Sequence, residues 1–172
     1  TVHPPFDTRI LFRECATLAR AGHDVTLVAA GEGEPEIQGV QMSYVARTSG
    51  RRGRMVQTAG AVARRALALH ADLYHVHDPE LLPWAQWMRL RGARVVFDMH
   101  ENLPGAILDK PWIRPRLRRP ASSAARLAER ALIGTMPVIF AEDSYRKYYP
   151  WVRQHATVLN MPDVARLACY RT

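Results

Sequence analysis

Two hydrophobic patterns alternate along the chain. Short apolar runs rich in β-branched residues predict strands, and apolar residues spaced three and four positions apart predict helices. Strands are expected at 24–30, 40–47, 72–78, 93–100, 137–142 and 156–160. Helices are expected from a cap at Asp7 or Thr8 to a stop at Gly22, and at 55–71, 79–91, 121–133 and 143–151. Because helices separate strands that are almost wholly apolar, we predict a doubly wound α/β fold with a mostly parallel sheet.

The length of 172 residues fits one domain, and a composition of 48% hydrophobic residues is enough for a packed core. The chain opens at Thr1 in turn-forming residues, so we expect a first strand to precede it and to be missing from this fragment. No apolar run approaches the roughly 18 residues of a membrane span, which makes a cytoplasmic location the default expectation. Cys15 and Cys169 stand alone, without the spacing of a zinc site or a disulfide framework.

The net charge of +8 is unevenly distributed. Arginines gather in two regions, one at 47–65 and one at 114–119. Such clusters attract nucleic acid, anionic lipid or phosphorylated substrates, although they also serve only to keep a protein soluble. The sequence leaves both interpretations open.

Polar residues collect where the predicted strands end. In a doubly wound sheet, ligands bind outside the carboxyl ends of the strands. The residues at these positions are His3, Asp7, Thr8, Arg9, His77, Asp78, Asp98, His100, Glu101, Glu142, Asp143 and Asn160. We therefore expect a functional rim along one edge of the sheet.

Two common kinds of site are disfavoured at this rim. The chain has neither GxGxxG nor a P-loop, so an independent dinucleotide or phosphate site is not expected. A metal site built from His75, His77, Asp78, His100 and Glu101 is conceivable, because His75 and His77 point to one face of a strand. Asp78 before Pro79, however, is typical of a helix cap followed by proline at the first helical position, and we expect no metal.

Four segments together resemble the N-terminal domain of GT-B glycosyltransferases of family 4. They are VHPPFDTRILFRECATLARAGHDVTLVA, ADLYHVHDPELLP, ARVVFDMHENLP and ATVLNMPD. The resemblance implies that residues 1–172 form a single Rossmann-like, acceptor-side domain, and that a separate C-terminal domain binds the donor. It also implies a retaining transfer of a sugar from a nucleotide-sugar to an acceptor, in the synthesis of cell-envelope polysaccharides or glycoconjugates.

The resemblance assigns roles to matching positions. His100 corresponds to a strand-end histidine that contacts the donor sugar, and is the expected catalytic residue. The expected acceptor-binding residues are Asp7, Thr8, Arg9, His77, Asp78 and Glu101. Asp7, Thr8 and Arg9 replace a glycine pair of many relatives, so Arg9 could offer a charged fork to an anionic group instead.

The same resemblance sets expectations for activity and partners. The family's donor signature, two glutamates separated by seven residues, is absent, so the fragment alone is expected to be inactive. No cofactor is expected, because the nucleotide-sugar is a substrate held mainly by the other domain. The expected partners are a sugar or lipid-linked acceptor, the C-terminal domain and, at the periphery, the inner face of a membrane. The alternative is a non-enzymatic basic module that binds nucleic acid or anionic membrane; the basic loops lack the interleaved aromatics of base-stacking surfaces, so no nucleic acid is expected.

Overall fold

The computed structural model describes residues 1–2, 5–48, 50, 53–159 and 161. His3, Asn160 and Cys169, and Arg51 and Arg52 of the arginine region 47–65, lie outside the described residues. Within the described part no helix is both long and apolar enough to cross a membrane.

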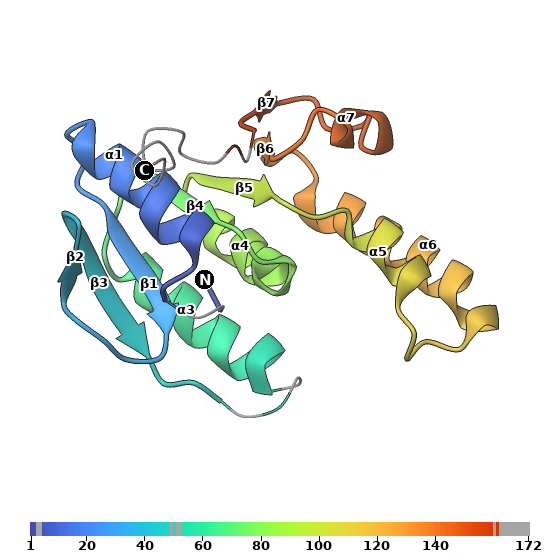
Figure 1. The fold of residues 1–172 in the computed structure, drawn as a ribbon, viewed down its shortest axis with the longest axis horizontal. Helices are drawn as coiled ribbons and strands as arrows, with labels where there is room; N and C mark the ends of the chain where they lie inside the picture. Colours follow the sequence, from blue (N-terminus) through green and yellow to red (C-terminus); the bar gives the residue numbers. More distant parts are fainter. Residues whose placement is uncertain (3–4, 49, 51–52, 160, 162–172) are drawn as a thin grey trace, which may run out of the picture.

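Two sheets form the centre of the fold (Figure 1). The larger contains β4 (Tyr74–Val76), β5 (Val95–Met99), β6 (Val138–Phe140) and β7 (His155–Thr157), which are all parallel and adjacent in that order. The smaller pairs β1 (Thr26–Ala30) in parallel with β3 (Val40–Val45) and adds the short antiparallel β2 (Glu36–Ile37). The predicted α/β class and mostly parallel sheet are confirmed.

The helices largely follow the predicted periodicity. The π-helical segment η1 (Thr8–Cys15) continues into α1 (Ala16–Arg20), and η2 (Arg54–Thr58) into α3 (Ala59–Leu67). After β4, the 3-10 turn η3 (Pro79–Leu81) leads into α4 (Leu82–Arg89), and after β6 comes the short α7 (Tyr145–Tyr148). Each of these lies inside a range in which the sequence predicts a helix, except that η2 begins one residue before the predicted start at 55.

The sequence predicts neither a helix nor a strand for the segment 101–115, and this prediction is wrong. It contains α5 (Leu103–Asp109), and α6 (Pro115–Ile133) begins six residues before its predicted start at 121. Pro104 lies in the first turn of α5, where a missing N–H costs nothing. Asn102 caps the helix by accepting a hydrogen bond from the Gly105 N–H at 3.1 Å. A side chain at Gly105 would meet the Asn102 amide 2.8 Å away, so the glycine makes room for the cap.

The main hydrophobic core lies between the larger sheet and helices α3, α4 and α6, with Phe97, Phe140, Leu82, Met88 and Ile133 fully buried. A second cluster under β1 and β3 buries residues of η1, which fixes this helical segment against the smaller sheet. The start of η1 also reaches the carboxyl end of β5, where Arg9 contacts Asp98.

Gly60, which weakens the α3 helix pattern in the sequence, has a packing role. A Cβ atom at this position would approach Trp84 Cζ2 to 2.7 Å. Alanine usually favours a helix over glycine by about 1 kcal/mol, but overpacking a core costs about 1–3 kcal/mol. We therefore expect Gly60→Ala to lower the free energy of unfolding, measured by urea denaturation. The loss should shrink in a Trp84→Phe background; an equal loss in both backgrounds would contradict the clash.

Candidate functional site

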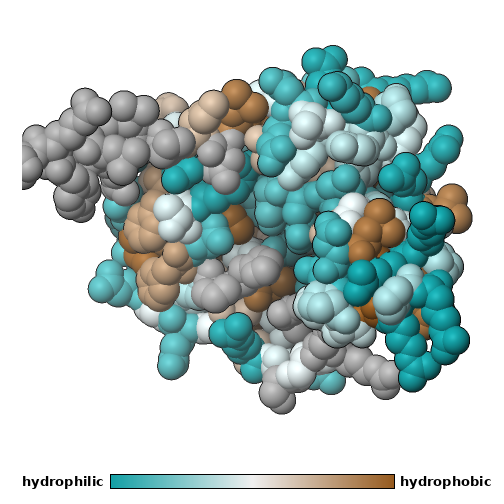
Figure 2. All heavy atoms as spheres, turned by 45° about the vertical axis from the view of Figure 1, so that its right-hand side comes forward, coloured by the Kyte–Doolittle hydropathy of each residue, from teal (hydrophilic) through white to brown (hydrophobic). Residues whose placement is uncertain are grey.

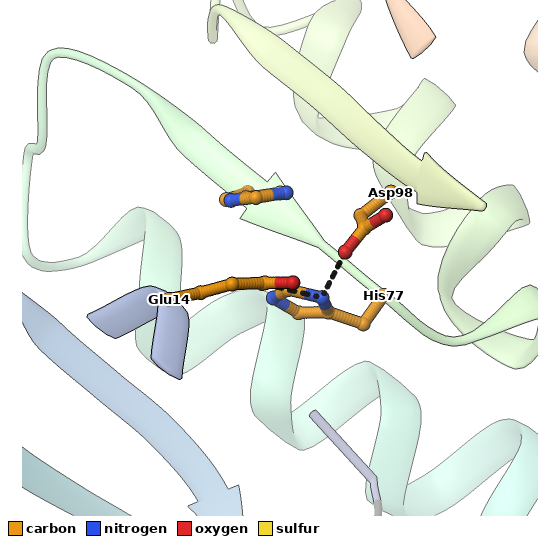
Figure 3. A group of neighbouring side chains, drawn as sticks. Glu14, His77 and Asp98 are labelled. Carbon is orange, nitrogen blue, oxygen red and sulfur yellow. Dashed lines mark hydrogen bonds and ion pairs between the residues drawn. The ribbon is translucent and has the colours of Figure 1, made fainter. Parts of the chain in front are cut away.

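A buried cluster of ionisable side chains lies at the carboxyl ends of β4 and β5. Arg9 and Glu14 come from η1, His77 follows β4, and Asp98 belongs to β5. Nη2 of Arg9 lies 2.9 Å from Oδ1 and 2.8 Å from Oδ2 of Asp98, and Nε of Arg9 lies 2.9 Å from Oε1 of Glu14. Nδ1 of His77 lies 3.2 Å from Oδ2 of Asp98 and 3.4 Å from Oε2 of Glu14 (Figure 3). One guanidinium and one imidazole thus share two carboxyl groups.

Local sequence places Arg9 in this cluster. The Asp7 side chain accepts hydrogen bonds from the N–H groups of Arg9, at 2.9 Å, and Ile10, at 3.0 Å. These bonds cap the start of η1, as the sequence predicts, and Ile10 and Leu11 bury the helix face beside Arg9. With its start fixed in this way, η1 directs the Arg9 side chain toward β5.

Asp98 and Glu14 have different protonation states, because both are buried and lie close to each other. Burial alone would raise the pKa of Asp98, but hydrogen bonds from His77 and Arg9 hold that pKa well below its usual range. Burial and the charge of Asp98 raise the pKa of Glu14 to about 8. Asp98 is therefore the charged partner of Arg9 at neutral pH, while Glu14 keeps its proton.

Two neighbouring histidines are neutral in this environment. Burial lowers the pKa of His77, and burial together with the nearby His77 lowers the pKa of His75 to about 4. The two rings lie with their centroids 4.4 Å apart. A neutral His77 that carries its proton on Nδ1 can donate it to Asp98, which fixes the orientation of the ring.

The cluster contains atoms that could bind a metal ion. Glu14, His75, His77 and Asp98 each offer a donor atom, all within 4.8 Å of one another. The Arg9 guanidinium, however, already supplies a positive charge to both carboxyl groups. This arrangement satisfies the charge without a metal, and the absence of a bound metal stays a prediction.

The loop after β5 carries His100 and is held by two tyrosines, one at each end of α7. The Tyr145 hydroxyl, at the start of α7, donates to the His100 backbone carbonyl at 3.0 Å. The Tyr149 hydroxyl lies 3.2 Å from Oδ1 of Asn102 and 3.0 Å from Oε2 of Glu129, a buried side chain of α6. Burial raises the pKa of Glu129 to about 7. These bonds fix the backbone on which the half-buried His100 ring is mounted.

The predicted rim residues differ in burial. Arg9 and His77 meet in the buried cluster, with His77 only 4% exposed, whereas Thr8 and Glu101 are exposed. His100 is intermediate: its Nδ1 atom is buried and has no hydrogen-bond partner among the described residues. The Arg9 fork, predicted to be available to an anionic group, is already engaged by Asp98 and Glu14.

The predicted capping role of Asp78 needs correction. Asp78 occupies the position before η3 in an extended conformation, but its side chain makes no capping hydrogen bond. Its Oδ2 atom instead accepts hydrogen bonds from the Thr1 hydroxyl at 2.8 Å and the Val2 N–H at 2.7 Å. Asp78 is fully buried, so its carboxyl group joins the start of the chain to the end of β4.

Glu14 is the site residue that the sequence analysis missed. It lies within the apolar periodicity of η1, where a single acidic residue attracts no attention. The available signal was Asp98, a carboxylate inside the apolar strand VVFDM, because a buried charge requires partners. The second carboxyl group beside Arg9 follows only once the packing of η1 on the sheet is known.

Comparison with known proteins gives one match. The family model described as Glycosyltransferase Family 4 matches residues 8–149. A search of curated proteins and a search of solved structures return no match. The matched range includes η1, both strands that carry the cluster, and the loop with His100.

Proposed function

The chain belongs to glycosyltransferase family 4, and from this premise we propose that it is the acceptor-side domain of a retaining, nucleotide-sugar-dependent glycosyltransferase. The proposed reaction moves a sugar from a nucleoside diphosphate to an acceptor hydroxyl or amine. Its transition state is oxocarbenium-like, and negative charge develops on the departing diphosphate. We place the donor-binding groups outside this chain, in a second domain, and the acceptor products in cell-envelope polysaccharides or glycoconjugates.

The observation that carries the proposal is the placement of His100. It directly follows β5, at the carboxyl edge of the parallel sheet where ligands of such folds bind. Its buried Nδ1 atom has no partner in the described part of the chain, and hydrogen bonds from Tyr145 and Tyr149 hold the surrounding loop. The His100 ring is only half-buried, so its exposed part is suited to bind a sugar hydroxyl and to position the donor.

The other predicted residues have two roles: some contact the acceptor, and the others hold the site in place. In the proposed enzyme the exposed Thr8 and Glu101 touch the acceptor. Asp7, Arg9, His77 and Asp78 are engaged inside the protein, so they hold η1 and the ends of β4 and β5 in place. Preorganised geometry of this kind lets a binding site act without reorganising during the reaction.

Turnover of sugar nucleotides by the complete gene product tests the proposal. We expect release of nucleoside diphosphate in the presence of an acceptor, and no turnover by residues 1–172 alone. His100→Ala should lower kcat roughly a hundredfold, the usual cost of removing one group that stabilises a transition state. His23→Ala removes an exposed imidazole and serves as the matched control. An unchanged kcat in His100→Ala would contradict the role of His100, and no turnover of any sugar nucleotide would contradict the proposed reaction.

A further inference from the structure

Helices α5 and α6 form an arm that projects from the larger sheet. Figure 1 shows the two helices side by side, extending away from β4–β7, with the loop that joins them at the far end. They pack on each other, and α6 also packs on α4. We define the tip of the arm as residues 108–119, which comprise the end of α5, the joining loop and the first part of α6.

The tip combines exposed apolar side chains with a dense positive charge. Trp112 is 65% exposed and Leu117 51% exposed, and Leu108 is also exposed. Five basic residues lie among them, at Lys110, Arg114, Arg116, Arg118 and Arg119. Figure 2 turns the right-hand side of Figure 1, which carries the arm, toward the viewer. On this face, separate hydrophobic patches lie among hydrophilic side chains.

The basic side chains of the tip are available to an anion. Within the described part of the chain, none of the five forms an ion pair with a carboxylate. Lys110 Nζ lies 5.0 Å from the centre of the Trp112 ring, and Arg118 Nε donates to the Ile113 carbonyl at 3.0 Å. Because Asp109 is the one acidic residue among 108–119, the tip keeps a net positive charge, while the local contacts order the loop.

From these observations we propose that the tip of the arm docks on an anionic lipid surface. A nucleic-acid backbone would need only the positive charge, whereas a lipid interface also accepts apolar side chains beside it. Lysine and arginine are drawn to anionic headgroups, and tryptophan and leucine enter the boundary between headgroups and acyl chains. The arm would thereby hold the rim of the sheet near an acceptor embedded in the membrane. The docking itself does not depend on the proposed sugar transfer.

Sedimentation with lipid vesicles tests the docking on the chain itself. We expect the protein to bind vesicles of phosphatidylcholine mixed with phosphatidylglycerol, to bind pure phosphatidylcholine weakly, and to dissociate as salt is raised. Trp112→Ser combined with Leu117→Ser should weaken binding at least about tenfold. Arg114→Ser combined with Arg116→Ser should do the same and also reduce the salt dependence.

Matched controls separate the tip from general surface properties. Leu90→Ser removes a leucine that is 86% exposed and flanked by two arginines, and Arg146→Ser with Lys147→Ser removes the same charge from α7. Both controls should bind vesicles as the unmodified protein does. Equal losses from the controls and the tip variants would overturn the proposal.

A second measurement shows insertion of the tip directly. Brominated acyl chains should quench the part of the tryptophan fluorescence that comes from Trp112, and Trp112→Phe should abolish this quenching while circular dichroism stays unchanged.

Two outcomes would overturn lipid docking. One is loss of binding in the arginine variant alone with no quenching, which would indicate a purely electrostatic surface. The other is tighter binding to duplex DNA than to vesicles. Turnover of a soluble acceptor by the complete enzyme should be unaffected by the tip variants, so failure here is distinct from failure of the proposed reaction.

Discussion

Asp98→Asn is expected to lower the free energy of unfolding by about 3–5 kcal/mol, because it breaks a buried ion pair on one side only. The Asp98 side chain is 0% exposed and accepts from both Arg9 and His77. Asparagine keeps the shape but offers one acceptor and no charge, which leaves the guanidinium short of a partner. Ionisation of Glu14 would compensate in part, so we expect Glu14→Gln in the same chain to deepen the loss. Urea denaturation at neutral pH measures the effect.

Two further variants show whether the loss comes from the unpaired charge. Arg9→Met added to Asp98→Asn should recover part of the stability, because it removes the cation that lacks its partner. Asp72→Asn changes an exposed carboxylate and should stay within about 0.5 kcal/mol of the unmodified protein. A loss in Asp98→Asn no larger than in Asp72→Asn would show that the Arg9 pair contributes nothing to folding.

The sequence was sufficient to predict the architecture, because the strands carry their signal in local composition. Val95–Met99 and Val138–Phe140 are short apolar runs between helical patterns, and such runs are typical of a parallel sheet that is covered on both faces. The region after His100 was harder. Pro104 and Gly105 are typical of loops, and the helix they begin depends on the Asn102 cap, which is one side-chain contact rather than a repeating pattern.

The sequence was sufficient to predict the edge of the sheet at which the site lies, but not the side-chain contacts within the site. Strand polarity brings His77, Asp98 and His100 to one edge of the sheet, which the sequence analysis anticipated. The sequence does not show which of these side chains form hydrogen bonds or ion pairs inside the protein. Arg9 and His77 became partners of Asp98 because η1 packs across that edge, and Asp78 turned toward Thr1 and Val2 for the same kind of non-local reason.

The charges within the cluster nearly cancel, which explains how so many ionisable side chains can be buried together at one edge of the sheet. Arg9 compensates one carboxylate, the proton of Glu14 removes the second negative charge, and the two histidines are neutral. The sum is close to neutral, which lowers the cost of burying five polar groups together. This balance depends on the Glu14 proton and therefore on pH.

Glu14→Gln is expected to gain stability relative to the unmodified protein as pH rises. The folded-state pKa of Glu14 is about 8, against an ordinary value of 4.5, so the folded protein holds this proton more tightly than the unfolded chain. The stability that Glu14 contributes is thus fully present below its ordinary pKa and is lost as pH rises to about 8. Glutamine resembles the protonated acid and cannot ionise, so the variant does not suffer this loss.

The difference between the two unfolding free energies isolates Glu14. Other titrating groups, including His75 and His77, are present in both proteins and largely cancel. The difference should shift toward the variant by up to about 1.4 kcal/mol per pH unit, or at most about 4 kcal/mol between about pH 5 and pH 8. Urea denaturation across this range measures it, with Glu32→Gln as an exposed control whose difference should not change. If the difference in unfolding free energy for Glu14→Gln also stays constant with pH, Glu14 is ionised in the folded protein and Arg9 is shared by two carboxylates.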